Sequence, residues 1–271
     1  MTRIALGLEY DGSHFDGWQT QPHGRTVQDT LEAALSRFAA QRIATICAGR
    51  TDAGVHASAQ VVHFDTSAER DPHAWVRGVN ALLPLTAAVT WAHEVPADFD
   101  ARRSARSRRY DYWIHNGAAR SPLLAGRAAW FYRPLDAALM HEAAQALAGQ
   151  HDFSSFRSAE CQAATPVRVM RSIGVTRSGP LLRIRLLANA YLHHMVRNIA
   201  GALLEVGAGR RSASWVGELL AERDRTKGAP TAPAAGLYLT GVEYDERFGL
   251  EPVREWADLT SWSGPGSRSA D

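Results

Sequence analysis

The sequence contains little of what disulfide-rich, metal-binding or membrane proteins are built on. Only two of its 271 residues are cysteine, Cys47 and Cys161. They are too few and too far apart for a disulfide framework or a cysteine-based zinc motif. No stretch approaches the roughly 18 apolar residues of a membrane-spanning helix. The amino terminus also lacks the charged and apolar regions of a secretory signal peptide. These absences favour a cytoplasmic protein without membrane contact.

Several nucleotide-binding and metal-binding motifs are also missing. There is no GxxxxGK[ST] P-loop and no HxE…PCxxC pattern of the zinc deaminases. The pair His193-His194 lies at the start of a predicted helix, where adjacent side chains point about 100° apart and cannot easily chelate one ion. Lys227 is the only lysine, and the net charge is just +2. The positions of the arginines, rather than the total charge, must therefore indicate any nucleic-acid partner.

What the sequence does contain is a regular succession of strand and helix patterns. The first half shows the order β-α-β-β-α-β, in which Thr26 and Asp71 are expected to cap the two helices. The second half is similar, and one of its helices is expected over 191–206. We therefore expect an α/β (α+β) fold of two similar ferredoxin-like or RNA-recognition-type halves, with mostly antiparallel sheets lining a central basic cleft. The expected divisions are residues 1–105, residues 106–248 and a flexible tail over 249–271.

A polar segment lies between two predicted strands of the first half. Residues 49–56 have the sequence GRTDAGVH, on a loop held by strands at both ends. Asp and Gly are common turn formers, so a purely structural turn is one explanation. The other is functional, because Arg50 favours the ionised form of Asp52, and an ionised carboxylate can attack an electrophilic carbon.

A basic and aromatic segment begins the second half. Residues 101–113 have the sequence ARRSARSRRYDYW. Clustered cations bind phosphates, and an aromatic face can stack on an extruded base. A solvated linker before a strand with buried aromatics would show the same pattern. Strand alternation puts Tyr110 and Tyr112 on one face and Asp111 and Trp113 on the other, so at most one pair faces a cleft.

Two later segments offer further candidates. Arg197 follows Met195 and Val196 on a predicted buried helix, and a buried arginine needs an anionic partner. That partner is either a structural carboxylate or a catalytic one. Residues 232–239 (APAAGLYL) form a turn into the last strand, where they either pack against the core or shape a pocket.

These segments together resemble the tRNA pseudouridine synthase A family. The strongest match is AGRTDAGVHASAQVVHF, and VNALLP, FDARRSA, RRYDYWI, HDFSSF, MVRNIAGALLEVG and TAPAAGLYL follow in the family's order. The matches cover roughly residues 3–248. The resemblance implies two α/β halves around a deep basic cleft, a homodimer, tRNA as the partner, and a reaction without cofactor or metal.

The resemblance also implies roles for particular residues. Asp52 corresponds to the family's catalytic aspartate, and Arg197 to the arginine that pairs with it. Tyr110 corresponds to the aromatic residue that stacks on the target base, and Arg50 to an arginine that helps to extrude the uridine. The other expected contacts are with the substrate (His56 and Leu237) and with the RNA backbone (Arg102, Arg106 and Arg108).

The implied reaction converts uridine to pseudouridine at positions 38 to 40 of tRNA, in the anticodon stem-loop. Asp52 would act either as a nucleophile at C1′ or in deprotonating the ribose to give a glycal, and the sequence leaves both routes open. Two other functions also remain open at this point: pseudouridine synthesis on another RNA, and RNA binding without catalysis. A metal-dependent hydrolase using the histidines is disfavoured by their spacing.

Overall fold

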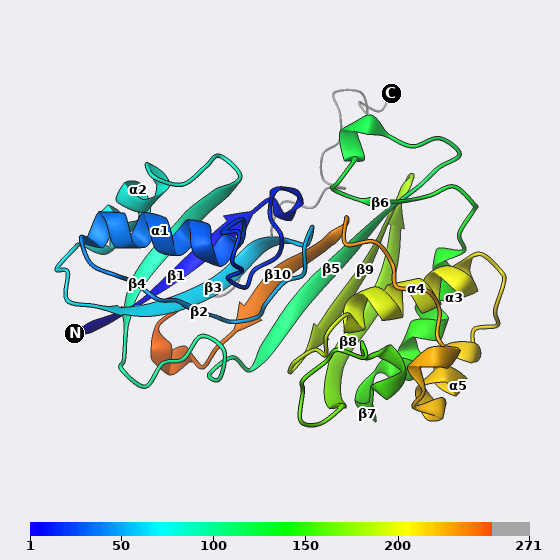
Figure 1. Cartoon of the computed structure of the whole chain (residues 1–271). Coiled ribbons are helices and arrows are strands. Elements are labelled where there is room, and N and C mark those ends of the chain that lie inside the picture. The colour runs from blue at the N-terminus through cyan, green and yellow to red at the C-terminus, as the bar shows by residue number, and fades with distance from the viewer. Residues whose placement is uncertain (251–271) are drawn as a thin grey trace, which may run out of the picture.

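The computed structural model describes residues 1–250, and one mixed sheet runs through this part of the chain (Figure 1). Along the sheet the strands follow the order β4-β1-β3-β10-β5-β9-β8-β7, with β2 paired to β3 and β6 paired to β5. All neighbours are antiparallel except β3 with β10 and β5 with β6. The strands are β1 (Thr2–Tyr10), β2 (Ile46–Cys47), β3 (His56–Thr66), β4 (Ala87–Val95), β5 (Ser107–Asn116), β6 (Ala129–Phe131), β7 (Gly149–Asp152), β8 (Val167–Ser178), β9 (Leu181–Ala188) and β10 (Leu237–Glu243).

Five α-helices accompany the described strands, two with the first half and three with the second (Figure 1). The caps of the first two are the expected ones: the Thr26 side chain accepts from the Asp29 amide, and Asp71 accepts from the His73 amide, which satisfies otherwise unpaired N–H groups. The helices are α1 (Val27–Ala39), α2 (Pro72–Asn80), α3 (Ala137–Ala144), α4 (Met195–Gly207) and α5 (Trp215–Glu222). The predicted α+β class with a mostly antiparallel sheet is confirmed.

The last strand joins the two halves of the molecule. In β10, Tyr238 pairs in parallel with His56 of β3, while Leu239 pairs in antiparallel with Tyr110 of β5. The expected division between residues 105 and 106 lies in the connection from β4 to β5, and the sheet crosses it. As a result, the loop before β3, the middle of β5 and the start of β10 lie next to one another.

The core lies between the sheet and its helices. In β9, Leu182, Ile184 and Leu186 are fully buried and alternate with more exposed residues, as expected for a strand with one covered face. Burying each such side chain contributes roughly 1.5–3 kcal/mol. In the first half, Trp75 of α2 packs edge-on against Phe64 of β3. Buried apolar side chains of the sheet therefore contribute to the core in both halves.

The structure corrects several expected elements. The strand expected before the polar segment 49–56 is short, Ile46–Cys47, and the short strands β6 and β7 were not predicted. The helix expected from Tyr191 begins at Met195, because His194 has a left-handed backbone conformation, with φ of 62°. The tail expected over 249–271 lies almost entirely outside the described residues. Within residues 1–250, no helix is long and apolar enough to cross a membrane.

Candidate active site at Asp52

Asp52 lies on the loop that connects β2 to β3, and neighbouring side chains fix this loop. The Tyr10 hydroxyl is 2.8 Å from the Thr51 hydroxyl, and the Trp18 amide donates to the Thr51 carbonyl. The buried Gln60 side chain donates to the Gly49 carbonyl and accepts from the Gly49 amide. The Asp52 side chain, 27% exposed, therefore projects from a loop of defined shape.

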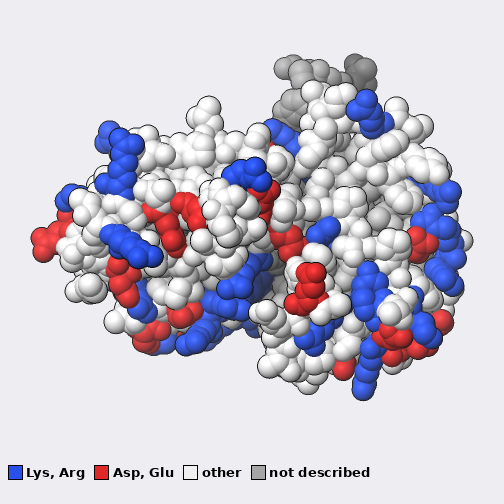
Figure 2. Space-filling model, in the orientation of Figure 1, with Lys and Arg blue, Asp and Glu red and all other residues white. Residues whose placement is uncertain are grey.

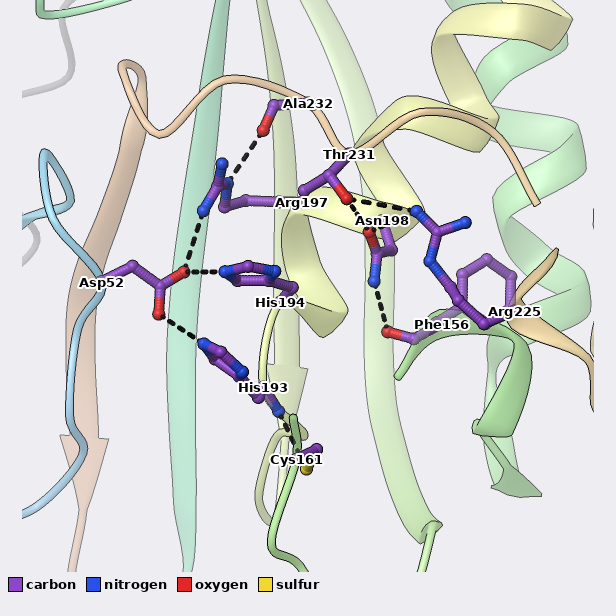
Figure 3. A network of polar contacts seen from close by, with 10 residues as sticks. All are labelled: Asp52, Phe156, Cys161, His193, His194, Arg197, Asn198, Arg225, Thr231 and Ala232. Atoms are coloured by element: carbon purple, nitrogen blue, oxygen red, sulfur yellow. Dashed lines mark hydrogen bonds and ion pairs between the residues drawn. The ribbon is translucent and has the colours of Figure 1, made fainter. Parts of the chain in front are cut away.

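Arg197, in the first turn of α4, contacts the Asp52 carboxylate. Its Nη1 donates to Oδ2 of Asp52 at 3.0 Å, and its Nε donates to the Ala232 carbonyl at 2.8 Å (Figure 3). The Arg197 carbonyl in turn accepts from the Ala232 amide. The ion pair is partly open to solvent, so it contributes at most about 1 kcal/mol to stability. Its main effect is to orient both groups.

A polar network anchors the beginning of α4 to the second half. The buried Asn198 amide group donates to the Phe156 carbonyl at 2.8 Å, and its oxygen accepts from Thr231 and Arg225. Figure 3 shows this network beside the Asp52–Arg197 contact. Because the network ties α4 to residues 225 and 231, the position of Arg197 depends on several segments of the second half.

Tyr110 and Leu237 lie on one face of the sheet. Leu237 pairs with Tyr112 and Leu239 with Tyr110, and cross-strand partners point to the same side. The Tyr110 ring is 8% exposed and packs edge-on against Tyr191, with ring centroids 4.9 Å apart. Burial raises the pKa of Tyr110, and the charge of Asp52 raises it further. The Tyr110 hydroxyl therefore stays protonated, and Tyr110 shares a local environment with Asp52.

The sequence did not reveal that both histidines of the His193-His194 pair contact Asp52. Nε2 of His193 is 3.4 Å from Oδ1, and Nε2 of His194 is 3.2 Å from Oδ2 (Figure 3). The argument that adjacent helical side chains diverge was wrong here, because both residues precede α4. The only available signal was the pair itself, directly before the Met-Val-Arg segment.

The same three side chains form a possible metal-ligand set. One donor atom from each of Asp52, His193 and His194 lies within 4.8 Å of the others, and these are ligand types that zinc uses. However, the Arg197 guanidinium already occupies Oδ2 of Asp52. Its positive charge opposes a cation at the same carboxylate.

The predicted RNA-contacting arginines fall into two groups. Arg50, Arg102 and Arg106 are exposed, and Arg106 forms an ion pair with Asp245. Arg108 is buried, and its five N–H groups donate to the carbonyls of Ala48, Ala105, Asn189 and Arg102. With all its donors used, Arg108 has a structural role in place of the predicted phosphate contact. Figure 2 shows the surface hollowed between the two halves, with basic side chains gathered at the lower end of the hollow.

The His56 ring has other partners than Asp52, although the two residues are close in sequence. Its ring stacks on Tyr238 with centroids 4.5 Å apart. Its Nε2 is 2.7 Å from the Gly126 carbonyl, and its Nδ1 accepts from the Gly12 amide. Tyr238 faces the opposite side of the sheet from Leu237 and Leu239. His56 thus packs in the wall of a cavity of about 440 Å³, and its expected substrate contact stays a prediction.

Comparisons with known proteins identify the family of this chain. Residues 8–102 and 143–245 match the family model described as tRNA pseudouridine synthase. Curated relatives named tRNA pseudouridine synthase A include one from Bordetella petrii, 58% identical over 96% of this chain and 98% of the relative. Others come from Chromobacterium violaceum (57%, over 95% and 98%) and Ralstonia nicotianae (56%, over 92% and 93%). The chain therefore belongs to the tRNA pseudouridine synthase family.

Proposed function

We propose that this enzyme isomerises uridine to pseudouridine at positions 38 to 40 of the tRNA anticodon stem-loop, with Asp52 as the catalytic carboxylate. The observation that carries the proposal is the setting of Asp52. It projects from a fixed loop, Arg197 donates to one of its oxygens, and Tyr110 lies in the same local environment. A carboxylate held in this way has a fixed direction, as a nucleophile or base requires.

The reaction breaks the bond from N1 of uracil to C1′ and forms a bond from C5 to C1′. The hydrogen on C5 leaves and N1 gains one, so the product has the atoms of the substrate and no electrons are exchanged. The uridine must first leave its stack, which costs a few kcal/mol. In our proposal the exposed Arg50 takes its place and binds phosphate, Tyr110 holds the uracil, and Leu237 lines the site. Because the isomerisation is redox-neutral, we propose that it uses no cofactor.

The decisive variant is Asp52→Asn, which keeps the size and polarity of the side chain but removes its charge. We expect it to bind tRNA as the wild type does and to form no pseudouridine. Glu69→Gln is the matched control, because Glu69 is exposed in the connection from β3 to α2 and should keep full activity. Substantial conversion by Asp52→Asn would exclude the proposed role of Asp52.

The substrate is tested by mapping pseudouridine in RNA from cells with and without the protein. We expect the signal at positions 38 to 40 of tRNA to disappear in cells that lack the protein, while ribosomal RNA is unchanged. A loss in ribosomal RNA alone would instead identify a synthase for another RNA. If the protein binds RNA but its loss changes no pseudouridine position, it is a non-catalytic RNA-binding module.

Two properties of the whole enzyme complete the proposal. From the family resemblance, we propose that it works as a homodimer in the cytoplasm. Light scattering on the purified full-length chain should give twice the mass of 29.6 kDa, and a monomer that is active at the same concentration would contradict this. Fractionation should recover the protein with cytoplasmic tRNA.

A further inference from the structure

The backbone at His194 is unusual for its position in the fold. Three non-glycine residues among residues 1–250 have a positive φ: Ala40, His194 and Arg223. Ala40 and Arg223 follow the ends of α1 and α5, where the left-handed conformation is common. His194 instead directly precedes α4. A left-handed residue other than glycine costs roughly 1–2 kcal/mol, so surrounding contacts must hold this conformation.

Those contacts lie on both sides of the histidine pair. The His193 amide donates to the Cys161 sulfur at 3.4 Å, and the His193 carbonyl accepts from the Ser158 amide at 3.0 Å. The His194 carbonyl accepts from the Asn198 amide within α4. The segment is therefore fixed by the loop after β7 on one side and by the helix on the other.

The consequence of this backbone is that two adjacent rings point the same way. The ring centroids of His193 and His194 are 4.0 Å apart, and their Nε2 atoms lie beside different oxygens of Asp52. In a regular helix the two side chains would diverge. Left-handed backbone that is maintained at a functional site suggests a functional constraint.

We propose that His193 and His194 are positioning residues that fix the Asp52 carboxylate, each beside one of its oxygens. The inference rests on the proposed role of Asp52. Arg197 and His194 both face Oδ2, whereas His193 lies beside Oδ1, at the longer distance of 3.4 Å. In this proposal Oδ1, the oxygen with the longer contact, is the one that faces the substrate. A carboxylate with three contacts has a fixed orientation. This orientation matters for the rate, because a misplacement of about 1 Å can lower a rate about 100-fold.

The protonation of His194 fits this role. Burial lowers its pKa, the charges of His193 and Arg197 lower it further, and Asp52 and Glu160 oppose them. The ring is therefore neutral at neutral pH, and with its proton on Nε2 it is a donor to Oδ2. At lower pH the ring gains a positive charge beside Asp52, which stabilises the carboxylate and weakens it as a nucleophile or base.

The test compares two substitutions at position 194. Asparagine tolerates left-handed backbone, so His194→Asn should fold, but its amide is too short to reach Oδ2. His194→Gln can place an amide donor near the position of Nε2. We expect His194→Asn to lower kcat about 100-fold with KM within about twofold, and His194→Gln to recover at least about tenfold of that loss. His73→Gln on the exposed start of α2 is the control and should be unaffected.

The pH dependence of kcat gives a readout that a merely structural role would not change. The wild type should lose kcat more steeply below pH 6.5, the ordinary pKa of histidine, than His194→Gln, whose amide does not titrate. Equal losses in the Asn and Gln variants, a change confined to KM, or identical pH profiles would each overturn the proposal.

The remaining outcomes separate this inference from the proposed function. If the wild type forms no pseudouridine, both the proposed function and the positioning role are excluded. An inactive Asp52→Asn variant beside a fully active His194→Asn variant would remove only the positioning role. Loss of wild-type activity in EDTA that zinc restores would overturn it as well, because the histidines would then be metal ligands.

Discussion

Arg102, Arg106 and Arg108 lie within seven residues, yet their guanidinium groups have different surroundings. Arg108 is buried, and all its donors contact backbone carbonyls. We expect Arg108→Met to lower the free energy of unfolding by about 2–4 kcal/mol, because several buried carbonyls would lose their donor. Urea denaturation measures this, with Arg106→Met as the exposed control. A variant as stable as the wild type would refute the structural role.

Arg102 is the contrasting case, because its side chain is exposed, and only its carbonyl accepts from Arg108. If it contacts phosphate, Arg102→Gln should weaken tRNA binding and reduce the slope of log affinity against log salt by about 1. Its kcat and its thermal stability should be unchanged. Titrations at several salt concentrations test this, and Arg70→Gln, on the exposed end of the first half, should leave the slope as it is.

Arg197 links the Asp52 carboxylate to the loop before β10. Removing its charge in Arg197→Met should lower kcat about 100- to 1000-fold, the usual effect of losing one aligned donor at a reacting group. Arg197→Lys keeps the charge but cannot donate to Asp52 and to Ala232 from a fixed fork, so it should recover only part of the activity. Single-turnover rates measure this loss, and full activity in Arg197→Met would show that Asp52 does not need its partner.

At the scale of the element, α4 packs so closely against a neighbouring loop that one position requires glycine. A Cβ atom at Gly201 would lie 2.2 Å from the Pro230 carbonyl oxygen. The same loop contains Ala232, which bonds to Arg197. We expect Gly201→Ala to destabilise the protein by about 1–3 kcal/mol and to lower kcat, because Arg197 shifts with the loop.

The matched control for this substitution is Gly217→Ala on α5. A Cβ atom there would meet only the Ala146 side chain, at 3.4 Å, which is an ordinary contact. Alanine is the better helix former by about 1 kcal/mol, so this variant should be as stable as the wild type or more so. Thermal denaturation and turnover should be measured for both variants. A loss of stability and kcat in Gly201→Ala alone would show that the tight contact of α4 is the cause and that an added methyl group has no general effect.

The elements that the sequence predicted are those with local signals. Thr26 and Asp71 predict the starts of their helices, because their side chains can cap the first turn. The start of α4 could not be predicted, because Tyr191 and Met195 have the apolar spacing of a helix although the residues before Met195 are not helical. The strands β6 and β7 are too short to show a period.

The same distinction explains what was predicted of the site. Asp52 and Arg197 were identified because a charge on a loop and a charge on an apolar helix each need an explanation. Their contact across 145 residues came only from the family resemblance. The arrangement of the histidine pair depends on a single left-handed residue. The environment of His56 depends on the side of β3 to which its ring points. Neither property is encoded in residue type alone.

At the scale of the whole molecule, buried histidines make stability depend on pH. Burial lowers the pKa of His56 and of His63, and each ring accepts a backbone N–H at Nδ1. Below pH 6.5, the ordinary value, the unfolded chain takes up protons that the folded chain does not, so stability rises with pH in this window and falls as pH is lowered through it.

Urea denaturation at pH 7.5, 6.5 and 5.5 should therefore show a falling free energy of unfolding. His63→Gln should reduce this dependence, whereas His14→Gln, on the exposed surface, should not. A free energy of unfolding that is constant over this range would contradict the prediction.

The position of β10 also has a consequence for how the protein is made. This strand begins at Leu237, yet it separates β3 from β5 in the centre of the sheet. A nascent chain that has not yet reached this point therefore presents two unpaired strand edges, the kind of surface that favours association with other chains. The loop carrying Asp52 and the strand carrying Tyr110 are joined only after synthesis has passed Leu237, so a ribosome stalled just before this point holds a chain that contains Asp52, Tyr110 and Arg197 without the strand that brings them together.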